Sequence, residues 1–233
     1  MDLAAYGLAA YAYPLVRTAH VLVMGYWLGS ELVINALTHY IARTRSLPAA
    51  ERMRLWDLLL DVDQHVRNAL ILSVPLGFTL ASSLGLVPLG TIGLAALWVV
   101  SALWFWFMWL VHWRRKTPEG RVLAAWDWRL RYLLIALFAG GALWSLATGW
   151  PLPTPWLALK VLLFAGVMAC GIAVRHYIRE AYRGPLPAIA EDSATEADES
   201  LFRSLMVKAT WALGVLWVLL FAIGALGALK TPT

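Results

Sequence analysis

The chain has 233 residues, of which 61% are hydrophobic and only 14% are charged, and its mean hydropathy is +0.68. Soluble globular domains carry about 25% charged residues, so this composition excludes an ordinary soluble domain. Several apolar runs reach the length of about 20 residues that crosses a hydrocarbon core of roughly 30 Å. The net charge of +5 resides mostly in short segments between these runs, so it does not indicate a nucleic-acid partner. We predict an all-α integral membrane bundle, a single domain over residues 1–233, with the lipid bilayer as its main partner.

Six transmembrane helices are expected in chain order, with boundaries set by hydrophobicity. They cover residues 12–41, 66–87, 91–113, 129–149, 154–177 and 201–228. The amphipathic segment 46–64, SLPAAERMRLWDLLLDVDQ, should extend the second span as a helix beyond the membrane. The acidic stretch 190–200 should form a loop or the N-terminus of a helix.

The connections between the expected spans fall into two classes by charge. The turns GLVPLGT (85–91) and GWPLPTP (149–155) carry no charge. The other connections are basic, with Arg43, Arg45, Arg52 and Arg54 after the first span, Arg114, Arg115, Lys116 and Arg121 after the third, and Arg175, Arg179, Arg183 and Arg203 around the connection after the fifth. The positive-inside rule puts basic connections in the cytoplasm. We thus predict a multi-pass protein of a bacterial-type inner (plasma) membrane with both termini outside, on the periplasmic side.

Spans two and three resemble spans four and five when the sequence is shifted by 64 residues without gaps. The shift aligns polar and glycine positions rather than the abundant Leu and Ala: Asp63 with Asp127, Arg67 with Arg131, Gly77 with Gly141, Gly85 with Gly149, His112 with His176 and Arg115 with Arg179. An internal duplication of a helical hairpin would explain these matches, since membrane folds often contain such repeats. Chance agreement in a biased composition is the alternative.

The first expected span carries polar side chains inside an otherwise apolar helix, at His20, Glu31 and Asn35. Ionisable residues inside a membrane are costly and are therefore hypotheses for function. His20, Trp27 and Glu31 are spaced by seven and four residues, which places them on one helical face. A hydrogen bond between helices is the alternative interpretation for His20.

Lys160 lies about one turn inside the fifth expected span, in TPWLALKVLLF (154–164). The first and fifth spans should both enter from outside, so His20 and Lys160 lie at similar depths, about 10 Å and about 9 Å at 1.5 Å per residue. An imidazole and an amine at one level can bracket a single cofactor. Imidazole is the usual axial ligand of haem iron, while a lysine can be the opposite ligand when neutral or pair with a propionate when charged. Snorkelling of the Lys160 ammonium to the headgroups is the alternative.

Three motifs occur in the spans that carry these residues. They are Arg17-x-x-His20 followed by Trp27 and Gly29, the segment RNALILSVPLGFTLASSLGL (67–86), and Trp156-Leu157-x-x-Lys160. The first is similar to the first helix of the HemJ/CopD-like membrane proteins, the second resembles that family's second helix, and the third resembles its gWLxxK element.

The resemblance implies a helical bundle that binds b-type haem through the first-helix histidine, here His20. HemJ members are associated with oxidation of protoporphyrinogen IX, and CopD members with copper handling. The histidine and lysine that are essential in HemJ correspond here to His20 and Lys160. HemJ proteins are shorter, usually with four or five spans, whereas this chain has an extra pair of spans and a charged loop.

A second group of histidines lies near the expected cytoplasmic face, at His39, His65, His112 and His176. Imidazole suits haem iron, copper and zinc, so a second haem or a metal is one interpretation. Interfacial histidines beside arginines are the other. His65 is the best candidate ligand of the four, because the acids in DVDQHVRN can orient an imidazole.

The sequence thus predicts a membrane protein with one or two b-type haems, acting in oxidation or electron transfer with a porphyrin or a quinone-like small molecule. His20 and Lys160 would be catalytic and would ligate the cofactor or a metal, with Arg17, Trp27, Glu31 and His65 as further cofactor-binding residues and His65, His112 and His176 as further metal ligands. A redox partner protein or a second copy of the chain would complete the assembly. The alternatives are a copper or small-solute transporter of CopD type and a structural membrane anchor for a partner enzyme. The scattered positions of Met24, Met108 and Met168 disfavour copper handling.

Overall fold

The computed structural model describes residues 3–229, with side chains from residue 12 onwards, and all regular structure within this range is helical. The helices in chain order are α1 (Leu3–Arg43), α2 (Ala49–Ser83), α3 (Thr91–Trp113), α4 (Pro118–Thr148), α5 (Pro155–Arg183), the short α6 (Pro185–Ala190) and α7 (Glu196–Ala228). The all-α class predicted from the sequence is confirmed.

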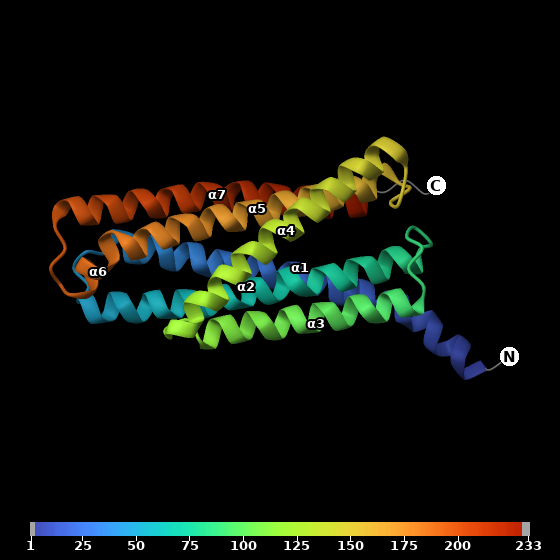
Figure 1. Cartoon of the computed structure of the whole chain (residues 1–233), viewed down its shortest axis with the longest axis horizontal. Coiled ribbons are helices and arrows are strands. Elements are labelled where there is room, and N and C mark those ends of the chain that lie inside the picture. Colours follow the sequence, from blue (N-terminus) through green and yellow to red (C-terminus); the bar gives the residue numbers. More distant parts are fainter. Residues whose placement is uncertain (1–2, 230–233) are drawn as a thin grey trace.

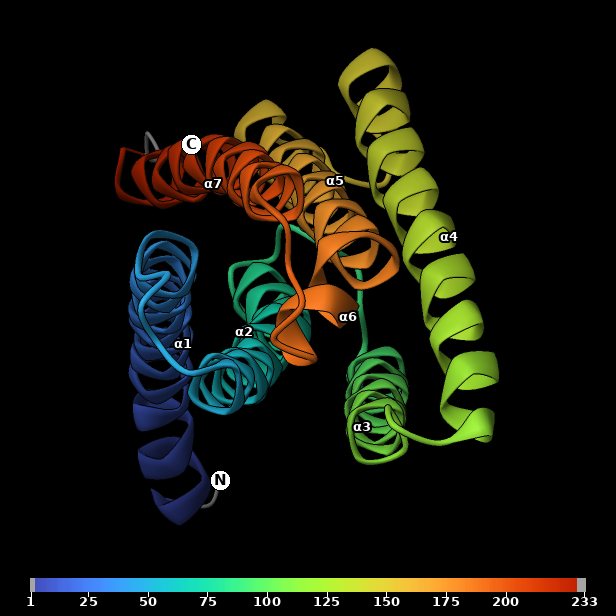
Figure 2. The same ribbon diagram turned by 90° about the vertical axis from the view of Figure 1, so that its left-hand side faces the viewer.

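The long helices form one bundle in which α1, α2, α5 and α7 surround the core (Figure 1 and Figure 2). α1 packs along α2, and α5 packs along α7. α3 lies against α2 at the periphery, and α4 crosses the bundle obliquely and packs against α5 (Figure 1). The end of the bundle that holds the α2–α3 and α4–α5 turns is called the turn end below. The opposite end, with α6 and the α1–α2 connection, is called the charged end (Figure 1).

Within the described residues, five helices are long and apolar enough to cross a membrane by length and composition. They are Ala12–Arg43 within α1 and the whole of α3, α4, α5 and α7. Large apolar side chains point outward from the bundle, such as Phe221 at 80% and Trp211 at 74% exposure. Water disfavours so much exposed apolar surface, whereas lipid tails cover it. The chain is therefore a multi-pass membrane protein.

α2 is not among these five helices, although a span was expected at 66–87. Arg67, Asn68 and three serines fall inside that stretch and lower its hydropathy. The helix also ends at Ser83, earlier than expected, because the chain turns at Gly85, where φ is 69° and glycine is favoured. The inner part of α2 is nevertheless central to the bundle, since Ile71 is fully buried.

The other expected spans coincide with observed helices, but most of these helices are longer. The span expected at 91–113 has the same bounds as α3, whereas those at 129–149 and 154–177 cover only parts of α4 and α5. The segment 46–64 is helical from Ala49 onwards, as predicted. The acidic stretch 190–200 contains a short loop and the start of α7, where the Thr195 and Asp198 side chains form a capping box.

Ion pairs connect the helices at the charged end. Arg52 on α2 and Glu199 on α7 form a buried pair with nitrogen–oxygen distances of 2.5 Å and 3.1 Å. An ion pair also connects the segment after α3 to α2: a guanidinium nitrogen of Arg115 lies 2.9 Å from a carboxylate oxygen of Asp61. Part of the basic charge in the connections is thus paired inside the molecule.

Candidate functional site

A cavity of about 480 Å³ lies between α1, α2, α5 and α7 near the turn end, and we call it the turn-end cavity. Its cationic and imidazole groups come from the first half of α1 and the start of α5. α2 and α7 contribute mainly small and aliphatic residues, including Gly77, Gly224 and Gly227. A largely apolar space with a few converging polar groups is typical of a cofactor or small-molecule site.

His20 and Lys160 both line this cavity, although one lies on α1 and the other on α5. The two side chains are close enough to interact electrostatically. The buried Nδ1 atom of His20 has no hydrogen-bond partner within residues 12–229. Buried polar atoms are nearly always satisfied, so this nitrogen points to a missing partner in the cavity.

Glycines on α7 and α2 let these two helices approach Lys160 and His20. A Cβ atom added at Gly227 would lie 2.5 Å from the Lys160 Nζ atom, and one added at Gly77 would lie 3.5 Å from the His20 Cε1 atom. The Lys160 Nζ atom also lies 5.7 Å from the centroid of the Trp156 ring, within the range of a cation–π interaction. The ammonium is therefore positioned by α5 and α7 together.

Two further predicted residues line the turn-end cavity, Arg17 and Trp27. Arg17 lies one turn before His20 and is exposed, so its guanidinium is available to an anionic group at the cavity. Trp27 is only 2% exposed and packs edge-on against Phe164 of α5, with ring centroids 6.4 Å apart. It forms the inner wall of the cavity.

A second cavity, of about 70 Å³, lies further along α1 toward the charged end, and we call it the charged chamber. The charged residues that line it come from four helices: Glu31 of α1, Asp63 and Arg67 of α2, Arg131 of α4 and Arg175 of α5. Trp27 lines both cavities, and its indole Nε1 donates to the Oε1 atom of Glu31 at 3.3 Å.

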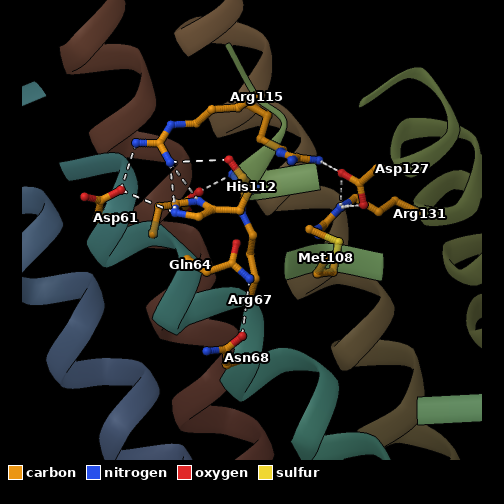
Figure 3. A network of polar contacts seen from close by, with 11 residues as sticks. Asp61, Gln64, Arg67, Asn68, Met108, His112, Arg115, Asp127 and Arg131 are labelled. Atoms are coloured by element: carbon orange, nitrogen blue, oxygen red, sulfur yellow. Dashed lines mark hydrogen bonds and ion pairs between the residues drawn. The ribbon is translucent and has the colours of Figure 1, made fainter. Parts of the chain in front are cut away.

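The arginines of the charged chamber are held by two aspartates. Asp127 of α4 is fully buried, accepts from the Arg131 Nε atom at 3.1 Å and also pairs with Arg175 of α5. Asp63 pairs with Arg67 on α2. Figure 3 shows Arg67 on one side of this network and the Asp127–Arg131 pair on the other, beside Met108.

The charged chamber was missed at the sequence level, although Glu31 was singled out. Asp127 and Arg131 entered only through the 64-residue alignment, and Arg175 only as a charge near the end of a span. A signal did exist, because Asp-x-x-x-Arg inside an apolar run places an acid and a base on one helical face. That spacing occurs at both aspartate–arginine pairs.

The histidines of the second group each contact different neighbours or are exposed. His65 bonds to the Tyr26 hydroxyl group, His112 contacts the Arg115 guanidinium and Asp61, and His176 is exposed on α5. His39 contacts the Thr210 hydroxyl group at 3.5 Å. Within the described part of the chain, no group of three or more His, Cys, Asp or Glu side chains is arranged to hold a metal ion. Of the expected metal ligands, His20 and Lys160 line the turn-end cavity.

Comparison of the chain with protein-family models, with curated proteins and with solved structures gives no match. The resemblance to HemJ/CopD-like proteins accordingly stays a prediction from the motifs.

Proposed function

We propose that this protein binds b-type haem in the turn-end cavity and acts in oxidation or electron transfer within the membrane. The observation that carries the proposal is that His20 and Lys160, from helices far apart in the sequence, line one apolar cavity of about 480 Å³. The buried Nδ1 atom of His20, which has no hydrogen-bond partner among the described side chains, and the adjacent ammonium give this cavity both a metal-binding and a cationic group.

The residues present fit a haem. His20 would ligate the iron through its imidazole, and Arg17 would pair with a propionate. Lys160 would either pair with a second propionate or supply a second ligand as a neutral amine. A Cβ atom added at Gly224 would meet open space, and the aromatic rings of Trp27 and Phe138 offer flat apolar walls. When bound, the haem would supply one-electron redox chemistry.

A quinone-like or porphyrin substrate suits the same surroundings. The lining of the turn-end cavity is mainly aliphatic and aromatic, from Val21 and Met24 on α1 to Leu220 and Ile223 on α7. A flat, mainly apolar molecule dissolved in the bilayer would enter such a space with little loss of polar contacts. This chemistry supports protoporphyrinogen-oxidase-like or quinone-linked electron transfer over a reaction of a water-soluble substrate.

The proposal includes six membrane spans in a bacterial-type inner membrane, with α2 as the sixth. α2 runs beside α1 through the bundle, and its buried inner part would be shielded from lipid by its neighbours (Figure 1). The turns at the turn end carry no charge, while the arginines gather at the charged end. This asymmetry supports a cytoplasmic charged end, with the haem cavity and both termini toward the outside.

An internal duplication of the α2–α3 and α4–α5 hairpins also belongs to the proposal. α3 begins at Thr91 and α5 at Pro155, which are aligned by the 64-residue shift. Gly85 and Gly149 are aligned as well, and both have a positive φ, of 69° and 74°. The aligned aspartate–arginine pairs of α2 and α4 both form ion pairs. These correspondences support a repeat more strongly than the residue identities alone.

The alternatives make different predictions for the purified protein. Copper bound without a haem Soret band would favour the transporter of CopD type. A colourless, metal-free protein that co-purifies with an enzyme would favour the membrane anchor.

The test is the amount of haem bound per chain after expression with ample haem supply. We expect haem in the wild type and in His176→Ala, whose histidine is exposed and away from the cavity, and a loss of most haem in His20→Ala. A wild type without haem, or equal haem in both variants, would contradict the proposal.

A further inference from the structure

The charged chamber contains ionisable groups that haem binding does not use. Its five charged residues lie among helices that pass through the bundle. Ionisable residues in such positions are costly, and they commonly mark ion pathways or proton relays.

The charges of the chamber are unequally paired. Arg67 pairs with Asp63, while Arg131 and Arg175 share Asp127, so three guanidinium groups face two aspartates. Among the described residues, Glu31 is the remaining acid that lines the chamber. A charged Glu31 makes the cluster neutral, and proton uptake by Glu31 leaves one positive charge in excess.

Glu31 stands apart from the ion pairs that surround it. Its side chain is nearly buried, at 6% exposure, and within residues 12–229 its hydrogen bond comes from the neutral indole of Trp27 rather than from an arginine. Facing it across the chamber are Asp63 and Arg67 of α2, Arg131 of α4 and Arg175 of α5, while α7 contributes the uncharged Thr210. Asp63 also repels it electrostatically.

The chamber has the size and lining for a short chain of water molecules. Each water needs about 10–15 Å³ of this kind of volume, so a chamber of about 70 Å³ has room for about five. Asn35 and Thr210, which hydrogen-bond to each other at 3.3 Å, add polar groups to its wall. Water in the charged chamber can therefore connect the Glu31 carboxyl group to the aspartate–arginine ion pairs.

We propose that Glu31 exchanges a proton between water in the charged chamber and the turn-end cavity, with the Trp27 indole as the partition between the two. A hydronium ion in the chamber water gives its proton to the Glu31 carboxylate, which yields the neutral acid and a water molecule, and the reverse transfer to water restores the carboxylate. Because Trp27 lines both cavities and bonds to Glu31, a small movement of this pair gives the acid access to the turn-end side. The exchange of this proton does not depend on the identity of the cofactor.

The test is infrared difference spectroscopy of the detergent-solubilised full chain between acidic and alkaline buffers, in H₂O and in D₂O. We expect a carbonyl band of a protonated carboxylic acid that titrates, shifts on exchange into D₂O and disappears in Glu31→Gln. Glu31→Asp should shift the band rather than abolish it. Glu191→Gln, which changes an exposed acid after α6, should leave the band unchanged.

A further variant keeps the proposal falsifiable if Glu31→Gln does not fold. Trp27→Phe retains the acid but removes its indole donor, so we expect the same band at higher frequency. A wild type without a titrating carboxylic-acid band, or a band that survives in Glu31→Gln, would overturn the proposal. Because a carboxylic-acid band at Glu31 does not require haem, its absence is distinct from a failure of haem binding.

Discussion

Trp27 and Glu31 lie one helical turn apart on α1, and the hydrogen bond of 3.3 Å between them joins the walls of two cavities. On the turn-end side lie His20 and Lys160, in an apolar cavity. On the other side lie the ion pairs of the charged chamber. A short stretch of one helix thus brings a large, mainly apolar cavity next to a small polar one.

The partition should depend on the ring volume of Trp27. Trp27→Ala removes a nearly buried ring and joins the two cavities, so we expect a loss of about 3–5 kcal/mol in the free energy of unfolding. Trp27→Phe keeps an aromatic ring against Phe164 and should lose markedly less. Thermal unfolding in detergent, followed by circular dichroism, measures both. Equal losses would show that ring packing is not what Trp27 contributes.

The two aspartates that hold the chamber arginines should differ in importance. Asp127→Asn leaves two guanidinium groups without their shared carboxylate in a fully buried place, and we expect a loss of about 3–5 kcal/mol. The Asp63 side chain is 22% exposed and pairs with one arginine, so Asp63→Asn should lose less because water screens the remaining charge. Parallel denaturation curves compare the two variants, and a larger loss for Asp63→Asn would contradict the assignment.

The position of the Lys160 ammonium should depend on Gly227. Gly227→Ala puts a methyl group 2.5 Å from the Nζ atom, so the flexible end of Lys160 must move, and we expect an altered haem spectrum or reduced haem content. The free energy of unfolding should change by no more than about 1 kcal/mol, which is the preference of a helix for alanine over glycine. Gly214→Ala, on the same helix in open space, is the control. Identical spectra for both variants would indicate that Lys160 does not contact the cofactor.

The turn between α3 and α4 should require glycine at residue 120. A Cβ atom there would lie 1.8 Å from the Arg114 carbonyl oxygen, so Gly120→Ala forces the backbone of the turn to shift. We expect a loss of about 1–3 kcal/mol, as for other overpacked sites. Gly141→Ala, in open space within α4, should be neutral or stabilising. Melting temperatures of the two variants in the same detergent test this contrast.

The sequence predicts the helical class and most helix positions because long apolar runs are separated by connections that contain either basic residues or glycine and proline. The bounds of α3 could be predicted because Gly90 precedes it and basic residues follow it. α4 begins earlier than the span predicted at 129–149. Its first turns contain charged residues, which lower the mean hydropathy and make this part of the helix resemble a loop. α2 shows the opposite effect, since Arg67 and Asn68 lower the hydropathy of a helix that packs in the centre of the bundle.

The sequence predicts only that part of the candidate site for which the position of a residue along its helix is enough. Counting residues places His20 and Lys160 at one level, and both line the turn-end cavity. The charged chamber depends on which way a side chain turns, and Arg175 turns inward to Asp127 rather than to the membrane surface. The histidines at 65, 112 and 176 were grouped by depth alone, which does not say that their helices face one another.

The most direct test of haem binding between His20 and Lys160 is the absorption spectrum of the detergent-solubilised protein, oxidised and dithionite-reduced. We expect a Soret band and a reduced α-band at the b-type position, both lost in His20→Ala, with a shifted spectrum in Lys160→Ala. A colourless wild type after expression with ample haem supply would contradict the account and leave Lys160 as a lysine that reaches toward the headgroups.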